Sequence, residues 1–379
     1  MFPDIEYLDW ITGRPERAEF DLGSSDLRRT PPGPDEVVPP ALAGLPAPPE
    51  DVTVEALLAD AYDVAPENVL VTAGATHANF LAVAATLRDP SEDEGDATAG
   101  SDEESAATAT DRVLVEKPGY EPLTATPAGL GATVDRFRRP TEDDYALDPG
   151  RVEGAMTADT TCVTVTNRHN PSGRRVSRET LSEVARTVAD ADARLLVDEV
   201  YAPFGAKPVE GAFGGPTAAS LPYTVVTNSL TKFFGFGGVR LGWLIADEEF
   251  VERAQQVKYH VPAVAEPSRR LARRALAHAS ELAAESRDRI RANHDLLAEL
   301  VATREDVSGY VADSCPFAFL AHDSADGDEV TAAAWEADTL VSPGRFFDDP
   351  EKFRVGVCQE SQNMQEAVSR FGAVADELD

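Results

Sequence analysis

The alternation of strand and helix patterns in the middle of the chain constrains its fold most strongly. Residues 162–167 (CVTVTN) form an apolar strand, and Ser177 can cap the helix expected over residues 178–192. Residues 194–201 (RLLVDEVY) and 223–230 (YTVVTNSL) predict two further strands. Strand, helix and strand in series form the crossover unit of a parallel sheet. The order therefore predicts an α/β fold in which helices cover both faces of a mostly parallel sheet.

Apolar patterns before this core extend the predicted sheet. Residues 68–74 (NVLVTAG) and 112–120 (RVLVEKPGY) predict two more strands, and a helical pattern over residues 75–87 follows the first of them. Residues 89–111 contain no large apolar side chain, so we expect a disordered surface insert there. Residues 1–50 are rich in proline and are expected to form an extended arm.

Helical patterns dominate the C-terminal part of the chain, most clearly over residues 268–304. We expect this part to form a smaller α+β domain. The predicted division is an N-terminal arm or part of the small domain over residues 1–45, a large domain over 46–255 and a small C-terminal domain over 256–379.

The charge of the chain is strongly acidic, with a formal net charge of −33 from 67 acidic and 34 basic residues. Nine of the acidic residues lie in residues 89–111, and without them the remaining 58 still far outnumber the bases. Such a surface argues against nucleic-acid and anionic-membrane partners. With only five lysines, it resembles proteins of salt-in halophiles, and we expect the fold to need high salt.

Targeting and metal-binding patterns give only negative indications. The N-terminus (MFPDIEYLDW) lacks a signal-peptide pattern, and no apolar run is long enough to cross a bilayer. We therefore expect a cytoplasmic protein with no membrane partner. The three cysteines and six histidines show no metal-ligand spacing, so no metal site is predicted.

Polar and aromatic residues follow five of the predicted strands. Ligands of open parallel sheets bind beyond the carboxyl ends of the strands, so these residues are expected to share one edge. They are Gly74, Ala75, Thr76, Tyr120, Asn170, Asp198, Tyr201, Ser229 and Lys232.

The first group of these residues suits a phosphate and an aldehyde. Free N–H groups at the helix start around Gly74–Thr76 favour an anion, and Ser229 and Arg240 can add hydrogen bonds to it. Lys232 can form an imine with an aldehyde, provided that its pKa is lowered so that the free amine is available.

The second group suits an aromatic ring that carries a nitrogen and a phenolate. Asp198 can hold a pyridine nitrogen protonated, because a buried carboxylate needs a positive partner. Asn170 and Tyr201 can bond a phenolate oxygen, and Tyr120 can stack on the ring. A phosphate, an aldehyde, a pyridine nitrogen and a phenolate on one ring describe pyridoxal 5'-phosphate.

The motifs that carry these residues resemble those of fold-type I pyridoxal-phosphate enzymes, specifically the class I/II aminotransferases. The resemblance runs in family order over about residues 20–357, through VTAGAT, EKPGY, TNRHNPSG, LLVDEVY, NSLTKFFGFGGVRLGW, VSPGRFF and FRVGV. It implies that Lys232 is the Schiff-base lysine and moves the α-proton of the substrate. It also implies that Arg354 binds the substrate α-carboxylate, that Gly23 belongs to a loop over the substrate, and that the protein is a homodimer. Ser24 or Ser25 beside Gly23 is a weaker candidate for contact with the substrate.

Two segments depart from the family pattern. The tyrosine that usually reaches the partner subunit's phosphate is missing from residues 31–51. Residues 263–272 (AVAEPSRRLA) keep the family's serine but have arginines where a glutamine is usual. The expected reaction is amino-group transfer between an α-amino acid and a 2-oxo acid. Candidates for reading a second carboxylate are Arg28, Arg29, Arg168 and Arg345.

Two alternatives remain open at this point. The first keeps the cofactor but makes the chain a lyase, a decarboxylase or a cyclising synthase. The second is a ligand-sensing regulator that uses an aminotransferase-like domain to bind a metabolite. The acidic charge disfavours the second alternative, since such regulators carry a basic DNA-binding domain.

Overall fold

The computed structural model describes residues 2–87, 111–205, 213 and 217–378. Of the acidic segment 89–111, only Asp111 belongs to these ranges, so the predicted disordered insert lies outside the described residues.

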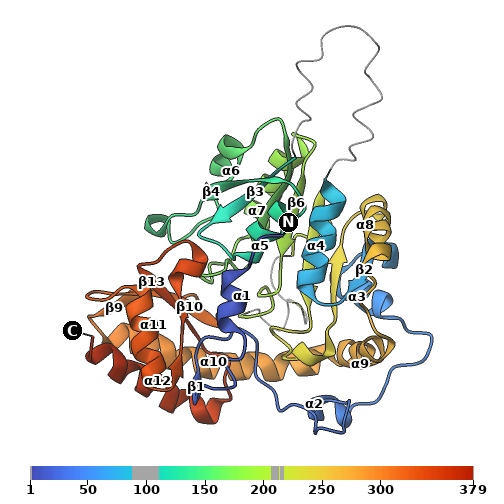
Figure 1. Cartoon of the computed structure of the whole chain (residues 1–379). Coiled ribbons are helices and arrows are strands. Elements are labelled where there is room, and N and C mark those ends of the chain that lie inside the picture. The colour runs from blue at the N-terminus through green and yellow to red at the C-terminus, as the bar shows by residue number, and fades with distance from the viewer. Residues whose placement is uncertain (1, 88–110, 206–212, 214–216, 379) are drawn as a thin grey trace.

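A seven-stranded sheet forms the centre of the larger part of the molecule (Figure 1). Its strands, in spatial order, are β2 (Val69–Thr72), β8 (Gly242–Ile245), β7 (Thr224–Ser229), β6 (Arg194–Asp198), β5 (Thr160–Thr166), β3 (Arg112–Lys117) and β4 (Thr133–Arg138). All neighbouring pairs are parallel except those of β8, which is antiparallel to both of its neighbours. The mostly parallel sheet is therefore confirmed, with β4 and β8 added to the strands expected from the sequence.

Helices cover both faces of this sheet because its inner strands are apolar on both sides. In β6, Leu196 packs into a cluster with α4 (Ala75–Thr86) and α8 (Glu248–His260). Leu195 and Val197, which point to the opposite face, pack into a second cluster with α3 (Val54–Tyr62), α7 (Arg178–Ala189) and α9 (Glu266–Ala277). Such continuous burial is typical of strands in doubly covered parallel sheets. Two short helices, α5 (Pro122–Gly129) and α6 (Pro149–Ala155), complete the layers.

A four-stranded antiparallel sheet forms the smaller part. Its order is β12 (Ser342–Pro343), β13 (Lys352–Gly356), β10 (Phe317–His322) and β9 (Val307–Tyr310), with α10 (Ala279–Thr303), α11 (Gly327–Glu336) and α12 (Ser361–Asp376). The expected smaller α+β part is therefore confirmed. The helical pattern over residues 268–304 is confirmed, and it is divided at His278 into α9 and α10. The domain limits stay a prediction, and α8 runs without a break through residues 255 and 256.

The N-terminal segment is not the plain extended arm expected from its prolines. It contains α1 (Glu6–Ile11), α2 (Pro40–Ala43) and β1 (Phe20–Asp21), which pairs with β11 (Thr339–Leu340). In Figure 1, α1 lies between the two sheets. The backbone N–H groups of Glu6 and Tyr7 donate to the carboxylate of Glu121, at 3.0 and 2.7 Å. This cap comes from a distant residue, which explains why the local sequence gave no signal for the helix.

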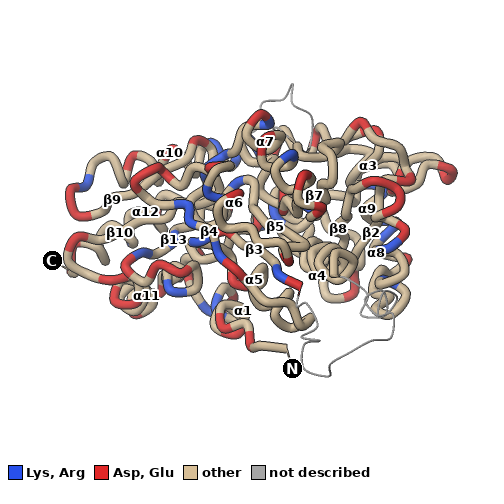
Figure 2. The backbone as a smooth tube through the Cα atoms, turned by 90° about the horizontal axis from the view of Figure 1, so that it is seen from above, with Lys and Arg blue, Asp and Glu red and all other residues tan. Residues whose placement is uncertain are grey.

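The distribution of charge agrees with the composition. Figure 2 shows that Asp and Glu are spread over elements of both sheets. Within the described ranges, no helix combines the length and the apolar character needed to cross a membrane.

Candidate active site

The carboxyl ends of the parallel strands meet the N-terminal segment and β13 at one enclosed cavity. Eight of the predicted residues line it: Ala75, Thr76, Tyr120, Asn170, Asp198, Tyr201, Lys232 and Arg354. Gly23, Gly74, Ser229 and Arg240 lie next to these residues without lining the cavity. We call the residues contributed by the large sheet and its loops the sheet side: Thr76, Tyr120, Asn170, Asp198, Tyr201 and Lys232. We call Tyr7, Gly23, Ser25 and Arg354 the arm side.

The start of α4 is shaped as an anion site. Gly74 precedes the helix with φ +94°, and no side chain caps the first turn. A Cβ at Gly74 would lie 3.1 Å from Arg240 Nη2, which donates to the carbonyl of Ala73 at 3.3 Å. Gly242, which pairs with Ser229, packs against the backbone of Gly74 and Ala75. Free N–H groups, a hydroxyl-bearing strand end and a guanidinium thus meet where a phosphate group can bind.

Asp198 ends β6 as a buried carboxylate that accepts hydrogen bonds from neutral donors. Asn79 Nδ2 donates to Oδ2 at 2.8 Å, and the N–H of Val200 donates to Oδ1 at 3.1 Å. Burial raises the pKa of Asp198, and these bonds oppose the rise. A protonated pyridine nitrogen supplies the direct cationic partner that such a carboxylate favours, so the site fits pyridoxal phosphate on its own geometry.

Lys232 lies in a cluster of hydroxyl groups. Its Nζ donates to Ser25 Oγ at 3.4 Å, and the Ser25 and Tyr201 hydroxyls lie 2.7 Å apart. The expectation of a lowered pKa is wrong for this arrangement. Burial lowers the pKa of Lys232, but Tyr201 and Asp26 favour the ammonium form and bring the net pKa above its ordinary value.

Arg354 closes the cavity from the arm side and is 1% exposed. Its Nη1 donates to Asn170 Oδ1 at 2.8 Å, and its Nη2 donates to Tyr7 OH at 2.9 Å and to the carbonyl of Gly23 at 3.3 Å. The cavity encloses only about 70 Å³ because these groups contact one another across it.

Several lining residues escaped the sequence analysis: Tyr7, Asn79, Thr166 and Val200. Asn79 lies one helical turn after Ala75 on α4, so helical spacing was an available signal for it. Tyr7 had no such signal, since α1 is positioned by Glu121. Ser25, only a weak candidate in the sequence, contacts both Lys232 and Tyr201.

The four arginines considered for a second carboxylate do not line the cavity. Arg28 donates to Asp21 and Ser24, and Arg29 to the carbonyl of Phe234. Arg168 donates to the carbonyl of Phe204, and Arg345 pairs with Asp328.

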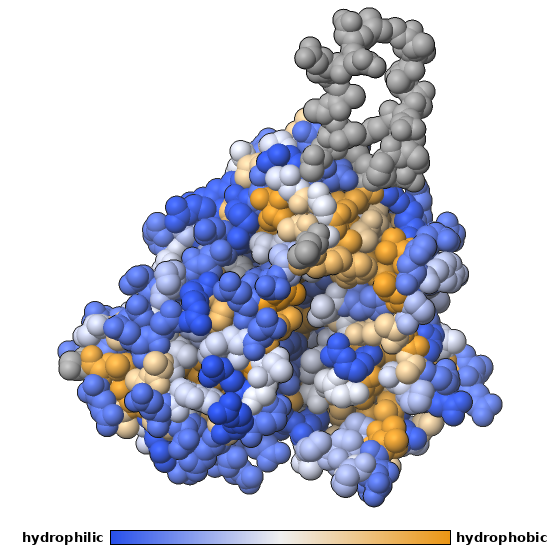
Figure 3. Space-filling view, viewed as in Figure 1, coloured by the Kyte–Doolittle hydropathy of each residue, from blue (hydrophilic) through white to orange (hydrophobic). Residues whose placement is uncertain are grey.

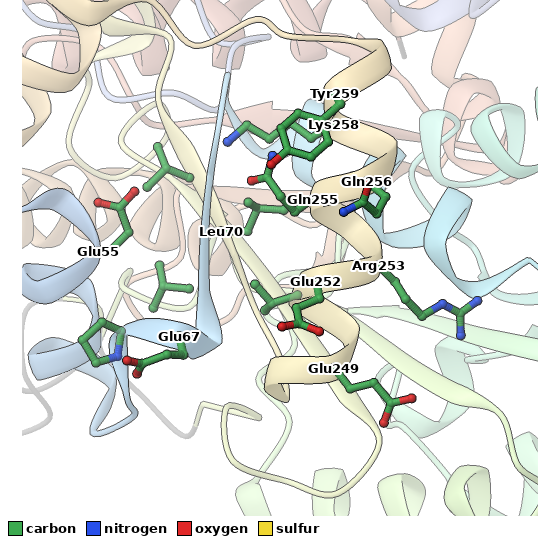
Figure 4. Close-up of a pocket in the computed structure, with 14 residues that line it drawn as sticks. Glu55, Glu67, Leu70, Glu249, Glu252, Arg253, Gln255, Gln256, Lys258 and Tyr259 are labelled. Atoms are coloured by element: carbon green, nitrogen blue, oxygen red, sulfur yellow. The ribbon is translucent and has the colours of Figure 1, made fainter.

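A wider hollow lies at the β2 edge of the large sheet and is about 780 Å³ in volume. Figure 4 shows charged side chains of α8 on one side of β2 and Glu55 and Glu67 on the other. It contains none of the predicted site residues, so chemistry rather than size identifies the candidate active site.

Comparisons with known proteins decide the family. The family model "Aminotransferase class I and II" matches residues 42–371. The chain belongs to the class I and II aminotransferases. This membership confirms the predicted enzyme class and its cofactor, pyridoxal 5'-phosphate.

Individual relatives agree with this membership. The chain is 27% identical over 355 residues to an aspartate/prephenate aminotransferase of Thermus thermophilus, covering 90% of this chain and 84% of that protein. It is 30% identical over 155 residues to a histidinol-phosphate aminotransferase of Rubrobacter xylanophilus, covering 39% of this chain and only 43% of that protein. Among solved structures, a PLP-dependent aminotransferase from Streptococcus suis superimposes with a TM-score of 0.80 at 19% identity, over 100% of this chain and 99% of the other. That structure supports the fold.

Proposed function

We propose that this aminotransferase moves an amino group between an α-amino acid and a 2-oxo acid at the cavity around Lys232. The observation that carries the proposal is the placement of Lys232 and Asp198 on one side of the cavity and Arg354 on the other. A lysine and an acid suit the cofactor, and a buried guanidinium suits a substrate carboxylate.

The sheet side binds the cofactor in this proposal. The start of α4, Ser229 and Arg240 hold the phosphate, and Asp198 holds the ring nitrogen protonated. When bound, pyridoxal phosphate supplies an electron-poor ring that stabilises negative charge at the substrate Cα. Tyr120 would pack on the ring of the bound cofactor, and Asn170 and Tyr201 would donate to its phenolate oxygen.

Lys232 is proposed to carry the proton that is moved from the substrate Cα. Its raised pKa means that the lysine must give up a proton before it can act as a nucleophile or as the base at Cα. Ser25 accepts from the Nζ of Lys232 and shares a hydrogen bond with the Tyr201 hydroxyl, which orients this group.

The arm side binds the substrate. Arg354 pairs with the α-carboxylate while its bonds to Asn170 and Tyr7 hold the guanidinium in place. Tyr7 and Gly23 then form the wall next to that carboxylate and exclude water from it.

A homodimer in the cytoplasm is part of the same proposal. Figure 3 shows an apolar area over α4. Phe80 in α4 and Leu87 just after it are only partly buried. Tyr259 in the last turn of the neighbouring α8 and Val261 just after that helix are exposed. An apolar area of this kind fits burial against a second copy of the chain.

Visible absorption tests the proposed function. Purified protein should show a visible absorption band of the bound cofactor that amino acids bleach and 2-oxo acids restore. Lys232→Ala should lose the band, while Lys258→Ala, a control in α8, should keep it. A band that shifts without being bleached by any amino acid would favour the lyase, decarboxylase or synthase alternative.

A further inference from the structure

A buried ion pair lies behind the active site, outside the cavity. Glu116 in β3 and Arg139 just after β4 are both 0% exposed, and Arg139 Nη1 donates to Glu116 Oε2 at 2.6 Å. Arg139 also donates to the carbonyl of Tyr145 at 2.9 Å. Burying two charges costs more free energy than packing apolar side chains of similar size. This cost points to a function of the pair other than stabilising the fold.

A chain of hydrogen bonds leads from the second carboxylate oxygen of Glu116 toward the cavity. Glu116 Oε1 accepts from the N–H of Thr166 at 2.8 Å and from its hydroxyl at 2.5 Å. The hydroxyl of Thr166 in turn accepts from the N–H of Asn170 at 2.9 Å. The side chain of Asn170 then accepts from Arg354 at 2.8 Å.

The proton positions along this chain are fixed by chemistry. Burial raises the pKa of Glu116, and Arg139 and Thr166 oppose the rise. Both oxygens of Glu116 accept from N–H donors, Oε2 from Arg139 and Oε1 from Thr166, as a carboxylate does. The single hydroxyl proton of Thr166 must therefore point to Glu116, which leaves its lone pairs for Asn170. The backbone N–H of Asn170 is held by Thr166, and the side-chain oxygen of Asn170 accepts from Arg354.

We propose that Glu116 is a positioning residue for the substrate-binding arginine, acting through Thr166 and Asn170. The buried charge at Glu116 fixes Thr166, Thr166 fixes the backbone of Asn170, and Asn170 Oδ1 sets the direction of Arg354 before the substrate arrives. This inference rests on the proposed role of Arg354 as the carboxylate ligand. Pre-orientation of a guanidinium lowers the entropy lost when it binds a carboxylate.

Substitutions at Thr166 test the proposal with little change in volume. Thr166→Val removes the hydroxyl and leaves Asn170 N–H without its acceptor, whereas Thr166→Ser keeps the hydroxyl. Thr164→Val is the matched control, because Thr164 is buried in the same strand but its hydroxyl contacts Cys162.

Two readings of the Thr166→Val holoenzyme are expected to change. KM for the amino acid and for the 2-oxo acid should both rise about tenfold, because a lost bond beside a charged group has that size. The dissociation constant of 2-methylalanine, followed by the shift of the cofactor band, should rise equally. This probe has an α-carboxylate and no α-hydrogen, so it can bind but cannot be transaminated through loss of an α-proton.

Other readings are expected to stay near the wild type. These are kcat and KM of Thr164→Val, and the affinity of Thr166→Ser for 2-methylalanine. Unchanged KM and 2-methylalanine binding in Thr166→Val would overturn the proposal, as would a Thr166→Ser variant that is as impaired as Thr166→Val. If the wild type binds 2-methylalanine but transaminates no amino acid, the proposed function fails while the positioning role is still decided by the probe.

Discussion

The two sides of the active site are held in different ways. On the sheet side, Asp198 ends a strand that pairs with a neighbour on each side, and both faces of that strand are covered by helices. On the arm side, the N–H groups of Glu6 and Tyr7 donate to Glu121, and the Tyr7 hydroxyl accepts from Arg354. Paired strands hold the residues proposed to bind the cofactor rigidly. A few side-chain hydrogen bonds hold the residues proposed to bind the substrate. Substitutions on the two sides should therefore separate effects on the cofactor from effects on KM.

The largest effect is expected on the sheet side, for Asp198→Asn. The amide cannot pair with the protonated ring nitrogen, and loss of one partner of a buried charge pair costs about 3–5 kcal/mol. We expect kcat/KM to fall about 10²–10³-fold and the affinity for pyridoxal phosphate to weaken. Steady-state kinetics and cofactor titration measure both. A variant with changed KM and unchanged kcat would break the distinction between the two sides.

A pH effect on stability is expected from Glu199, the residue next to Asp198. Burial raises the pKa of Glu199 to about 7 from an ordinary value of 4.5, with Ala218 N–H and the Thr217 hydroxyl opposing the rise. Between these two pH values the unfolded chain has lost the proton and the folded chain keeps it. The contribution of Glu199 to the free energy of unfolding therefore falls as pH rises through this window, by up to about 3 kcal/mol.

Glu199→Gln removes this titration and should leave catalysis near the wild type. Denaturant unfolding at several pH values should show the variant gaining stability relative to the wild type as pH rises from about 4.5 to about 7. A difference between the two proteins that does not depend on pH would contradict the assignment.

A smaller effect is expected on the arm side, for Tyr7→Phe. The variant removes the hydroxyl beside Arg354 and keeps the ring, so KM should rise about tenfold with kcat and cofactor affinity unchanged. Tyr145→Phe is the control, since Tyr145 shares the aromatic cluster of Tyr7 but does not line the cavity. A fall in kcat without a change in KM would place Tyr7 with the sheet side instead.

Salt is expected to change the difference between the sheet side and the arm side least. Screening of the net charge of −33 should raise the melting temperature when KCl increases from about 0.1 M to about 3 M. Both sides of the site are buried, so relative effects of the variants above should stay the same. Thermal unfolding followed by circular dichroism measures the shift, and a melting temperature that does not rise would contradict the salt requirement.

The sequence predicted the sheet side better than the arm side for a physical reason. Asp198, Asn170 and Lys232 follow apolar strands, and parallel strands bring such residues to one edge whatever the rest of the chain does. The break between α9 and α10 and the antiparallel strand β8 depend on tertiary packing, so local patterns missed them. Tyr7 was missed because the contacts that place it come from Glu121 and Arg354, more than 100 residues away in sequence.

The pKa of Lys232 shows the same limit. Its identity and position followed from the motif around it. The direction of its pKa shift depends on Tyr201 and Asp26, which reach it from other segments of the folded chain. Sequence position gives the residue, and tertiary structure gives its electrostatics.

The most direct test of this account is to reduce the holoenzyme with borohydride and map the pyridoxyl group by peptide mass spectrometry. The chain has five lysines, at positions 117, 207, 232, 258 and 352, so the assignment is unambiguous. The account predicts the modification on Lys232 and its loss in Lys232→Ala. A pyridoxyl group on another lysine, or none after incubation with pyridoxal phosphate, would contradict the assignment of the site.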